Sequence, residues 1–247
     1  MQISVIASGS NGNSTLVEYK GVSVLIDAGI SVAEMEKRLI NLGKKLSGIN
    51  ALLLTHSHSD HSLSVGAISR KYNIPVYLTK EVHKHCENRI KEIKAVYFSS
   101  KKDFNIDAVT VVPVKTSHDV PSSGFVIGDF GIFTDTGFIT DHMKDMITGL
   151  KGVLLESNYD ENMLKNGPYS MELKKRIKSN NGHLSNLDSS NFINKSGSHL
   201  KLVLLGHISQ MNNFPAIVKR TFEKTVIKKM NYFILSRYKE SGVFRVS

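Results

Sequence analysis

Three histidines and an aspartate crowd into the run HSHSDH at residues 56–61. The run directly follows the apolar stretch ALLLT, which predicts a loop at the end of a buried strand. Imidazole nitrogens and carboxylate oxygens are ligands that suit zinc, and also manganese or iron. A chain with ten histidines in 247 residues is not expected to cluster them this way by chance. The run therefore predicts a metal site.

Further ligand-type residues stand singly, each near the carboxyl end of an apolar stretch. They are Asp27 after VSVLI, His118 after VTVVPVKTS, Asp135 after GIFT and His207 after LKLVLLG. Any one of them alone is typical of a turn or a cap. Ligands gather at the carboxyl ends of strands in α/β folds, so the set together indicates one site assembled from distant parts of the chain.

The stretches between these residues alternate between strand and helix patterns. The first half predicts the order β-β-β-α-β-α-β, with a hairpin around Lys20-Gly21. The second half predicts strands at 107–119, 123–137, 151–158 and 200–209, and helices at 141–150, 170–180, 186–196 and 214–229. Two such halves predict an α/β protein, an αββα four-layer sandwich formed by a single domain over residues 1–247.

Composition narrows the class of protein. The net charge of +10 favours anionic partners such as nucleotides or nucleic acid, although the basic residues are scattered. No stretch approaches the roughly 20 apolar residues of a membrane span, and the N-terminus lacks a signal-peptide pattern, so no membrane partner is expected. The chain has a single cysteine, Cys86, so an intrachain disulfide is excluded and a reducing cytoplasm is favoured. We expect its thiol to be unreactive.

The ligand-type residues resemble, in their usual order, the five motifs of the metallo-β-lactamase superfamily. The resemblance implies that superfamily's fold and two divalent metal ions; the nitrogen-rich ligands favour zinc, and manganese is compatible. It implies one metal on His56, His58 and His118, the second on Asp60, His61 and His207, and Asp135 as the bridge. Asp60 is also a candidate catalytic residue, and Asp27 would orient the site through hydrogen bonds.

Local sequence points to one branch of the superfamily. LLLTHSHSDH, TDTGF, LLESNYD, GHLSN and GHISQMNN resemble the YycJ/WalJ-like branch, which includes bacterial and phage-borne exonucleases or nucleotide phosphodiesterases. That branch in turn resembles phage anti-Pycsar proteins, which hydrolyse cyclic mononucleotides. A bridging carboxylate in place of a cysteine ligand points away from true β-lactamases. The resemblance therefore implies hydrolysis of a phosphodiester.

Residues outside the motifs are assigned with alternatives left open. By analogy with RNase Z-like enzymes, His183 is the candidate general acid; the alternative is a capping or supporting histidine. The candidate substrate-binding residues are Ser8, Ser10, Asn11 and Asn13, in a loop that could present N–H groups to phosphate or be an ordinary turn, together with Glu156 and Asn158. The other histidines, at 83, 85, 142 and 199, are expected to be structural or solvated.

Our interpretation is a cytoplasmic, homodimeric phosphodiesterase acting on a cyclic nucleotide such as cyclic CMP or cyclic UMP. It would be a phage protein that erases a Pycsar signal in the host cytoplasm. A compact chain favours a small nucleotide, whereas the +10 charge favours a polymer, so a YycJ-like 5′–3′ DNA exonuclease is the close alternative. A glyoxalase-like thioester hydrolase and a metal-free binding protein are more distant alternatives.

Overall fold

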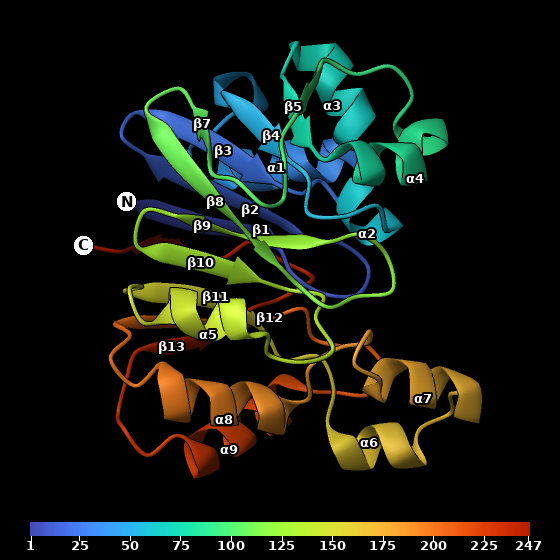
Figure 1. The fold of residues 1–247 in the computed structure, drawn as a ribbon, viewed down its shortest axis with the longest axis vertical. Helices are drawn as coiled ribbons and strands as arrows, with labels where there is room; N and C mark the ends of the chain where they lie inside the picture. Colours follow the sequence, from blue (N-terminus) through green and yellow to red (C-terminus); the bar gives the residue numbers. More distant parts are fainter. The chain divides into compact units, whose positions relative to one another are not determined.

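The structure is a computed structural model that describes residues 1–247. The chain forms two compact units, each with its own strands and helices (Figure 1). Unit 1 comprises residues 1–113 and 236–247, and unit 2 comprises residues 114–235.

Unit 1 is built on a mixed seven-stranded sheet with the order β14-β1-β2-β3-β4-β5-β6. The strands β3 to β6 run parallel, whereas β14, β1, β2 and β3 pair antiparallel. Lys20 and Gly21, both with positive φ, form the tight turn of the predicted β2–β3 hairpin. The strands are β1 (Gln2–Ala7), β2 (Ser14–Tyr19), β3 (Val22–Ile26), β4 (Ala51–Leu53), β5 (Val76–Leu78), β6 (Ala95–Tyr97) and β14 (Val243–Arg245).

The helices of unit 1 bury one face against this sheet. In α1, Ser31 caps the first turn by accepting from the Glu34 amide, and Met35 and Leu39 are buried with Leu25 in one hydrophobic cluster. Each such side chain contributes about 1.5–3 kcal/mol on burial. The helices are α1 (Val32–Asn41), α2 (Ser59–Ser62), α3 (Val65–Tyr72) and α4 (Lys80–Ile90), with a 3₁₀ turn at Leu46–Gly48. The unit also holds the hairpin of β7 (Phe104–Ile106) and β8 (Val109–Lys115), whose last residues cross into unit 2.

Unit 2 has strands in the order β13-β12-β11-β10-β9. β10 to β13 run parallel, and β9 forms an antiparallel hairpin with β10. Each of β9 to β12 is buried along its whole length, which explains their nearly unbroken apolar sequences. The strands are β9 (Ser123–Ile127), β10 (Phe130–Phe133), β11 (Gly152–Glu156), β12 (Leu202–Gly206) and β13 (Tyr232–Ile234).

The helices of unit 2 fall into two groups. α8 and α9 pack on each other, and α9 also contacts β13. Figure 1 shows α6 and α7 as a separate pair within this unit, and α7 buries none of its side chains. The helices are α5 (Asp141–Ile147), α6 (Glu161–Asn166), α7 (Met171–Lys178), α8 (Asn186–Ser196) and α9 (Pro215–Thr225). No helix of the protein has the length and apolar character to cross a membrane.

The predicted order of the longer elements is confirmed, with differences at shorter ones. The short helices α2 and α6 were not predicted, and the strand predicted at 123–137 is the hairpin of β9 and β10. The helix predicted over 214–229 ends at Thr225, where the β-branched run Thr225-Val226-Ile227 disfavours a helix and Val226 is extended. Strands β6, β7, β13 and β14 were not predicted. Each has three residues, which is too short for an alternating pattern to be recognised in sequence.

Candidate metal centre

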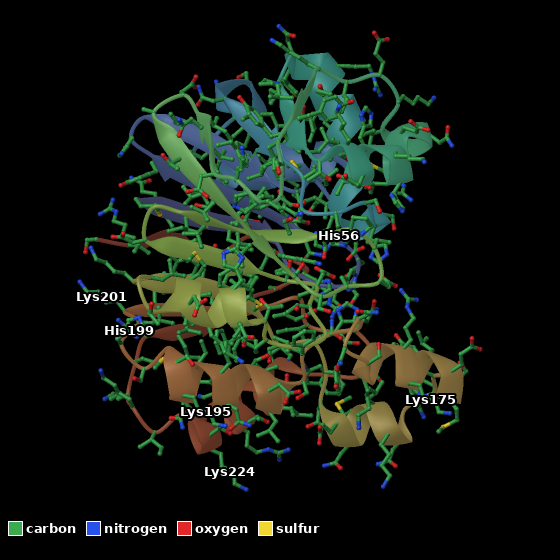
Figure 2. The ribbon with its side chains drawn as sticks, in the orientation of Figure 1. His56, Lys175, Lys195, His199, Lys201 and Lys224 are labelled. Carbon is green, nitrogen blue, oxygen red and sulfur yellow. The ribbon has the colours of Figure 1, made fainter.

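Unit 1 carries the candidate ligands of HSHSDH in the loop after β4 and within α2, and Figure 2 shows His56 beside that helix. The ring of His56 lies 4.8 Å from the ring of His58 and 4.1 Å from that of His61, between centroids. His61 Nε2 lies 3.4 Å from Asp60 Oδ2. Two ligand atoms bound to one tetrahedral metal at 2.0–2.2 Å are about 3.4 Å apart. The donor atoms of Asp60 and His61 therefore fit one ion.

Asp27 and Thr55 set the orientation of two of these rings. The Asp27 carboxylate accepts from the Thr55 amide and hydroxyl at 2.9 Å, and its Oδ2 lies 2.7 Å from His61 Nδ1. Thr55 Oγ1 lies 2.9 Å from His56 Nδ1. With both Nδ1 atoms hydrogen-bonded, Nε2 is the nitrogen of each ring that would bind a metal, and on His61 the metal would replace the Asn13 amide, whose Nδ2 lies 2.9 Å from that Nε2. Burial raises the pKa of Asp27, and the adjacent His61 opposes that effect.

Asn13 joins the glycine-rich loop to the same ligands. Its amide donates to the Asp60 carbonyl at 2.8 Å, and its Nδ2 lies 2.9 Å from His61 Nε2 and 3.3 Å from Asp60 Oδ2. The amides of Ser8, Gly9, Gly12 and Asn13 donate within the protein. That leaves the amides of Ser10 and Asn11, both exposed residues, as the loop's candidates for a phosphate.

Gly29 lies where the glycine-rich loop meets the segment that carries Asp60. Its amide donates to Asn13 O at 2.9 Å, and a Cβ at this position would lie 1.6 Å from Asp60 O. We expect Gly29→Ala to lower the free energy of unfolding by about 1–3 kcal/mol, because the backbone at Asp60 must move to admit the methyl group. Urea unfolding measures this. Gly48→Ala is the matched control, since nothing lies within 4 Å of its Cβ position. Equal unfolding free energies for the two variants would contradict the prediction.

Unit 2 holds a second cluster centred on Glu156 at the end of β11. Its Oε1 accepts from His183 Nδ1 at 2.8 Å and from His207 Nδ1 at 2.6 Å. Its Oε2 accepts from the amides of Thr136 and Leu184 at 3.1 and 3.2 Å. Burial by itself raises the pKa of Glu156, but the two imidazoles outweigh it and hold the pKa well below the ordinary value. Glu156 is thus an anion that fixes two histidine rings.

The Asp135 carboxylate lies among three imidazoles of this unit. Its Oδ1 is 3.5 Å from His207 Nε2 and 3.8 Å from His118 Nε2 and His183 Nδ1. Ligand atoms of Asp135, Glu156, His183 and His207 all lie within 4.8 Å of one another. The spacing between Asp135 and His207 is again close to that of two ligands on one ion. The unit 2 residues therefore also fit a divalent metal.

Three strand-end residues share an unusual backbone conformation. Asp27, Asp135 and His207 have φ of 60°, 56° and 54°, in the left-handed region that favours glycine. Asp27 directly follows β3, His207 directly follows β12, and Asp135 lies two residues beyond β10. Strained backbone of this kind clusters at functional sites, where the surrounding structure holds it. The left-handed conformation at three of the predicted site residues therefore supports a functional site at these strand ends.

The remaining predicted residues contribute in different ways. Asn158 is buried and donates from Nδ2 to the His207 carbonyl at 2.8 Å, and Asn11 accepts from Arg237 Nη1 at 3.3 Å. For Glu156 and Asn158, the structure shows contacts to histidines, and their substrate-binding role stays a prediction. Thr55 was missed by sequence reasoning; its place directly before His56 was the available signal.

Two of the other histidines make hydrogen bonds outside the candidate metal centre, and the single cysteine is buried. His83 Nδ1 lies 2.7 Å from the Tyr97 hydroxyl, and His85 Nδ1 lies 2.8 Å from the carbonyl of Glu81. Burial raises the pKa of the Cys86 thiol to about 11, which makes its reactive thiolate scarce at neutral pH.

Comparison with known proteins gives one consistent family. The family model described as the metallo-beta-lactamase superfamily matches residues 7–144. The chain is 32% identical over 229 residues to the exodeoxyribonuclease WalJ of Streptococcus pneumoniae, covering 88% of this chain and 85% of WalJ. It is 36% identical over only 67 residues to the anti-Pycsar protein Apyc1 of Paenibacillus xerothermodurans, covering 25% of this chain and 26% of Apyc1.

A solved structure supports the fold. The metallo-beta-lactamase fold protein YhfI from Bacillus subtilis superposes with a TM-score of 0.78 at 16% identity, covering 99% of both chains. The predicted α/β class and metallo-β-lactamase fold are confirmed. The chain belongs to the metallo-β-lactamase superfamily of metal-dependent hydrolases and, within it, to the YycJ/WalJ-like branch.

Proposed function

We propose that this protein is a two-metal phosphodiester hydrolase that removes nucleotides from the end of a DNA strand. The observation that carries the proposal is the similarity to an exodeoxyribonuclease over 88% of this chain. The net charge of +10 supports the same substrate class, because a basic protein attracts the phosphate backbone. DNA exonuclease activity was the close alternative on sequence grounds, and the comparisons support it over more of the chain than they support cyclic-nucleotide hydrolysis.

The proposed ligand set is the one that the superfamily's motifs imply for this sequence. Bound there, two divalent ions, zinc or manganese, would supply a hydroxide at neutral pH and neutralise charge on the phosphate. The set is His56, His58 and His118 for one ion, Asp60, His61 and His207 for the other, with Asp135 between them. Thr55, Asp27 and Glu156 keep the imidazoles in a fixed tautomer and orientation, which raises metal affinity without binding the metal.

His183 is the proposed general acid. Its Nδ1 is bonded to Glu156, so Nε2 is the atom that would give a proton to the departing oxygen of the phosphodiester. Burial lowers the pKa of His183, but the Glu156 carboxylate outweighs burial and raises it above the ordinary value. The imidazole therefore holds a proton readily near neutral pH.

The direct test compares substrates under metal control. Purified protein would be incubated, with zinc or manganese and separately with EDTA, with 5′-phosphorylated linear DNA, closed circular DNA and cyclic CMP. We expect metal-dependent release of mononucleotides from linear DNA and none from the circle. Hydrolysis of cyclic CMP alone would overturn the proposal in favour of the cyclic-nucleotide hypothesis, which the match to Apyc1 supports over 67 residues. Turnover of S-lactoylglutathione alone would favour the thioester hydrolase.

Helix α7 is the basic surface we expect to hold the DNA backbone. It carries Lys174, Lys175, Arg176 and Lys178, and Arg176 forms an ion pair with Asp119, the neighbour of His118. We expect Lys175→Gln with Lys178→Gln to weaken DNA binding several-fold and to lower the slope of log K against log salt by roughly 0.7–0.9 per lysine. Fluorescence anisotropy across a salt series measures both.

A matched pair of lysines provides the control. Figure 2 shows Lys195 and Lys224 on the part of unit 2 formed by α8 and α9, whereas Lys175 lies on α7. Lys195→Gln with Lys224→Gln removes the same charge. If both double variants weakened DNA binding equally, the effect would be one of net charge, and α7 would have no special role.

Two expectations on organisation stay predictions. They are a single domain over residues 1–247 and a homodimer. Limited proteolysis would test the first, since separate domains would yield stable fragments, and light scattering after size-exclusion chromatography would test the second.

A further inference from the structure

Unit 2 contains a cavity of about 710 Å³ to which the proposed function assigns no role. Its walls come from the segment 115–122 after β8, from the segment 138–142 after β10, and from Asn181. The volume lies within the range of about 300–1,000 Å³ typical of small-ligand sites. His118, a proposed metal ligand, is part of the wall. The cavity is therefore large enough for a nucleotide and adjoins the candidate metal centre at His118.

The walls are tied together by hydrogen bonds between the segments. The Gly137 amide donates to the Ser117 carbonyl at 2.8 Å, and the Ser117 amide donates to Thr136 Oγ1 at 3.1 Å. A Cβ on Gly137 would lie 2.3 Å from the backbone of Asn180, so only glycine permits this close approach. The Ser117 hydroxyl also donates to Asn181 Oδ1 at 3.3 Å. The cavity is thus formed before any ligand arrives.

Phe138 lines this cavity with an exposed aromatic ring. It is 43% exposed, and its carbonyl accepts from Thr136 Oγ1 at 2.8 Å, which fixes its backbone. An exposed phenylalanine on a fixed backbone is a platform on which a base can stack at little cost in entropy. The same cavity presents cationic and imidazole side chains, from Lys115 and His142, suited to phosphate. A nucleotide can therefore be held by stacking on its base and by charge interactions with its phosphate.

We propose that this cavity binds the nucleotide next to the scissile bond, with Phe138 stacked on its base and Lys115 and His142 facing its phosphate. The inference rests on the proposed function, which it deepens by naming the part of the substrate that unit 2 recognises. Stacking accepts any base, so the site would select a nucleotide without selecting a sequence. Such tolerance is what an enzyme that shortens a DNA strand needs.

A fluorescence experiment tests the cavity independently of catalysis. The chain has no tryptophan, so Phe138→Trp introduces a single reporter into the full-length protein. We expect dAMP, dGMP and dCMP to quench its emission in a saturable way in metal-chelated protein, with Lys115→Gln weakening the response. Phe233→Trp, at a phenylalanine that is 47% exposed on β13, is the matched control. Saturable quenching of the reporter at 233 but not at 138 would overturn the inference.

Kinetics separate this inference from the proposed function. For Phe138→Ala we expect KM for linear DNA to rise about 10- to 100-fold, which is the loss of one stacked base, and Phe138→Tyr to restore it. On DNA whose terminal nucleotides lack bases, Phe138→Ala and the unaltered protein should perform alike. If Phe138→Ala degraded DNA with an unchanged KM, the nucleotide site in the cavity would be contradicted, and the proposed exonuclease activity would stand. Saturable quenching of the reporter at 138 in a protein that does not degrade DNA would support the nucleotide site and contradict the proposed exonuclease activity.

Discussion

Replacing Asp60 by alanine is expected to lower hydrolysis of linear DNA by roughly 10³-fold or more. The carboxylate lies 3.4 Å from His61 Nε2, so the change removes one of two adjacent donors for the same ion. A bound metal contributes several kcal/mol to stabilising charge on the phosphate, and each 1.36 kcal/mol is tenfold in rate. Metal content by atomic emission, measured together with the rate, should fall below that of the unaltered protein.

The Asp60 variant should still fold. The shorter contact between Asp60 and the glycine-rich loop uses the Asp60 carbonyl, which accepts from the Asn13 amide at 2.8 Å and remains in alanine. Only the 3.3 Å hydrogen bond from Asn13 Nδ2 to the carboxylate is lost. Asp141→Ala is the control, since this aspartate on α5 has a side chain that is 92% exposed. Full metal content and full rate in Asp60→Ala would show that Asp60 is not a ligand.

Replacing His183 by alanine is expected to slow kcat on DNA by about 10²–10⁴-fold, which is the usual contribution of a general acid. Metal content should stay near that of the unaltered protein, because the proposed metal ligand His207 keeps its own bond of 2.6 Å to Glu156. Single-turnover kinetics and metal analysis on the same preparation would measure both. A loss of metal that matches the loss of rate would make His183 a ligand instead.

A change of leaving group distinguishes proton donation from positioning. p-Nitrophenolate departs without needing a proton, so His183→Ala should hydrolyse bis(p-nitrophenyl) phosphate at nearly the unaltered rate. A residue that only positions the site would slow both substrates alike. His85→Ala, at an exposed histidine of α4, controls for the loss of an imidazole.

The candidate ligand residues could be picked out from sequence because each one stands close to the strand pattern that precedes it. HSHSDH follows β4 within a few residues, and Asp27 and His207 directly follow buried strands. An apolar run marks a strand, and a lone histidine or aspartate at its end marks the edge where ligands gather. The unpredicted strand β14 shows the opposite case. Its three residues form a strand only because they pair with β1, in the register Gln2 to Arg245, more than two hundred residues away.

Sequence by itself determined the ligand types, the order in which the chain delivers them, and therefore the family. Only the tertiary structure decided how those ligands are held. Glu156 bonds His183 and His207 from 27 and 51 residues away, and Thr55 is oriented by an aspartate 28 residues earlier. The left-handed backbone at Asp27, Asp135 and His207 is likewise imposed by surrounding structure, because these residue types do not require it. Such contacts depend on which strand ends lie side by side, and spacing along the chain does not contain that information.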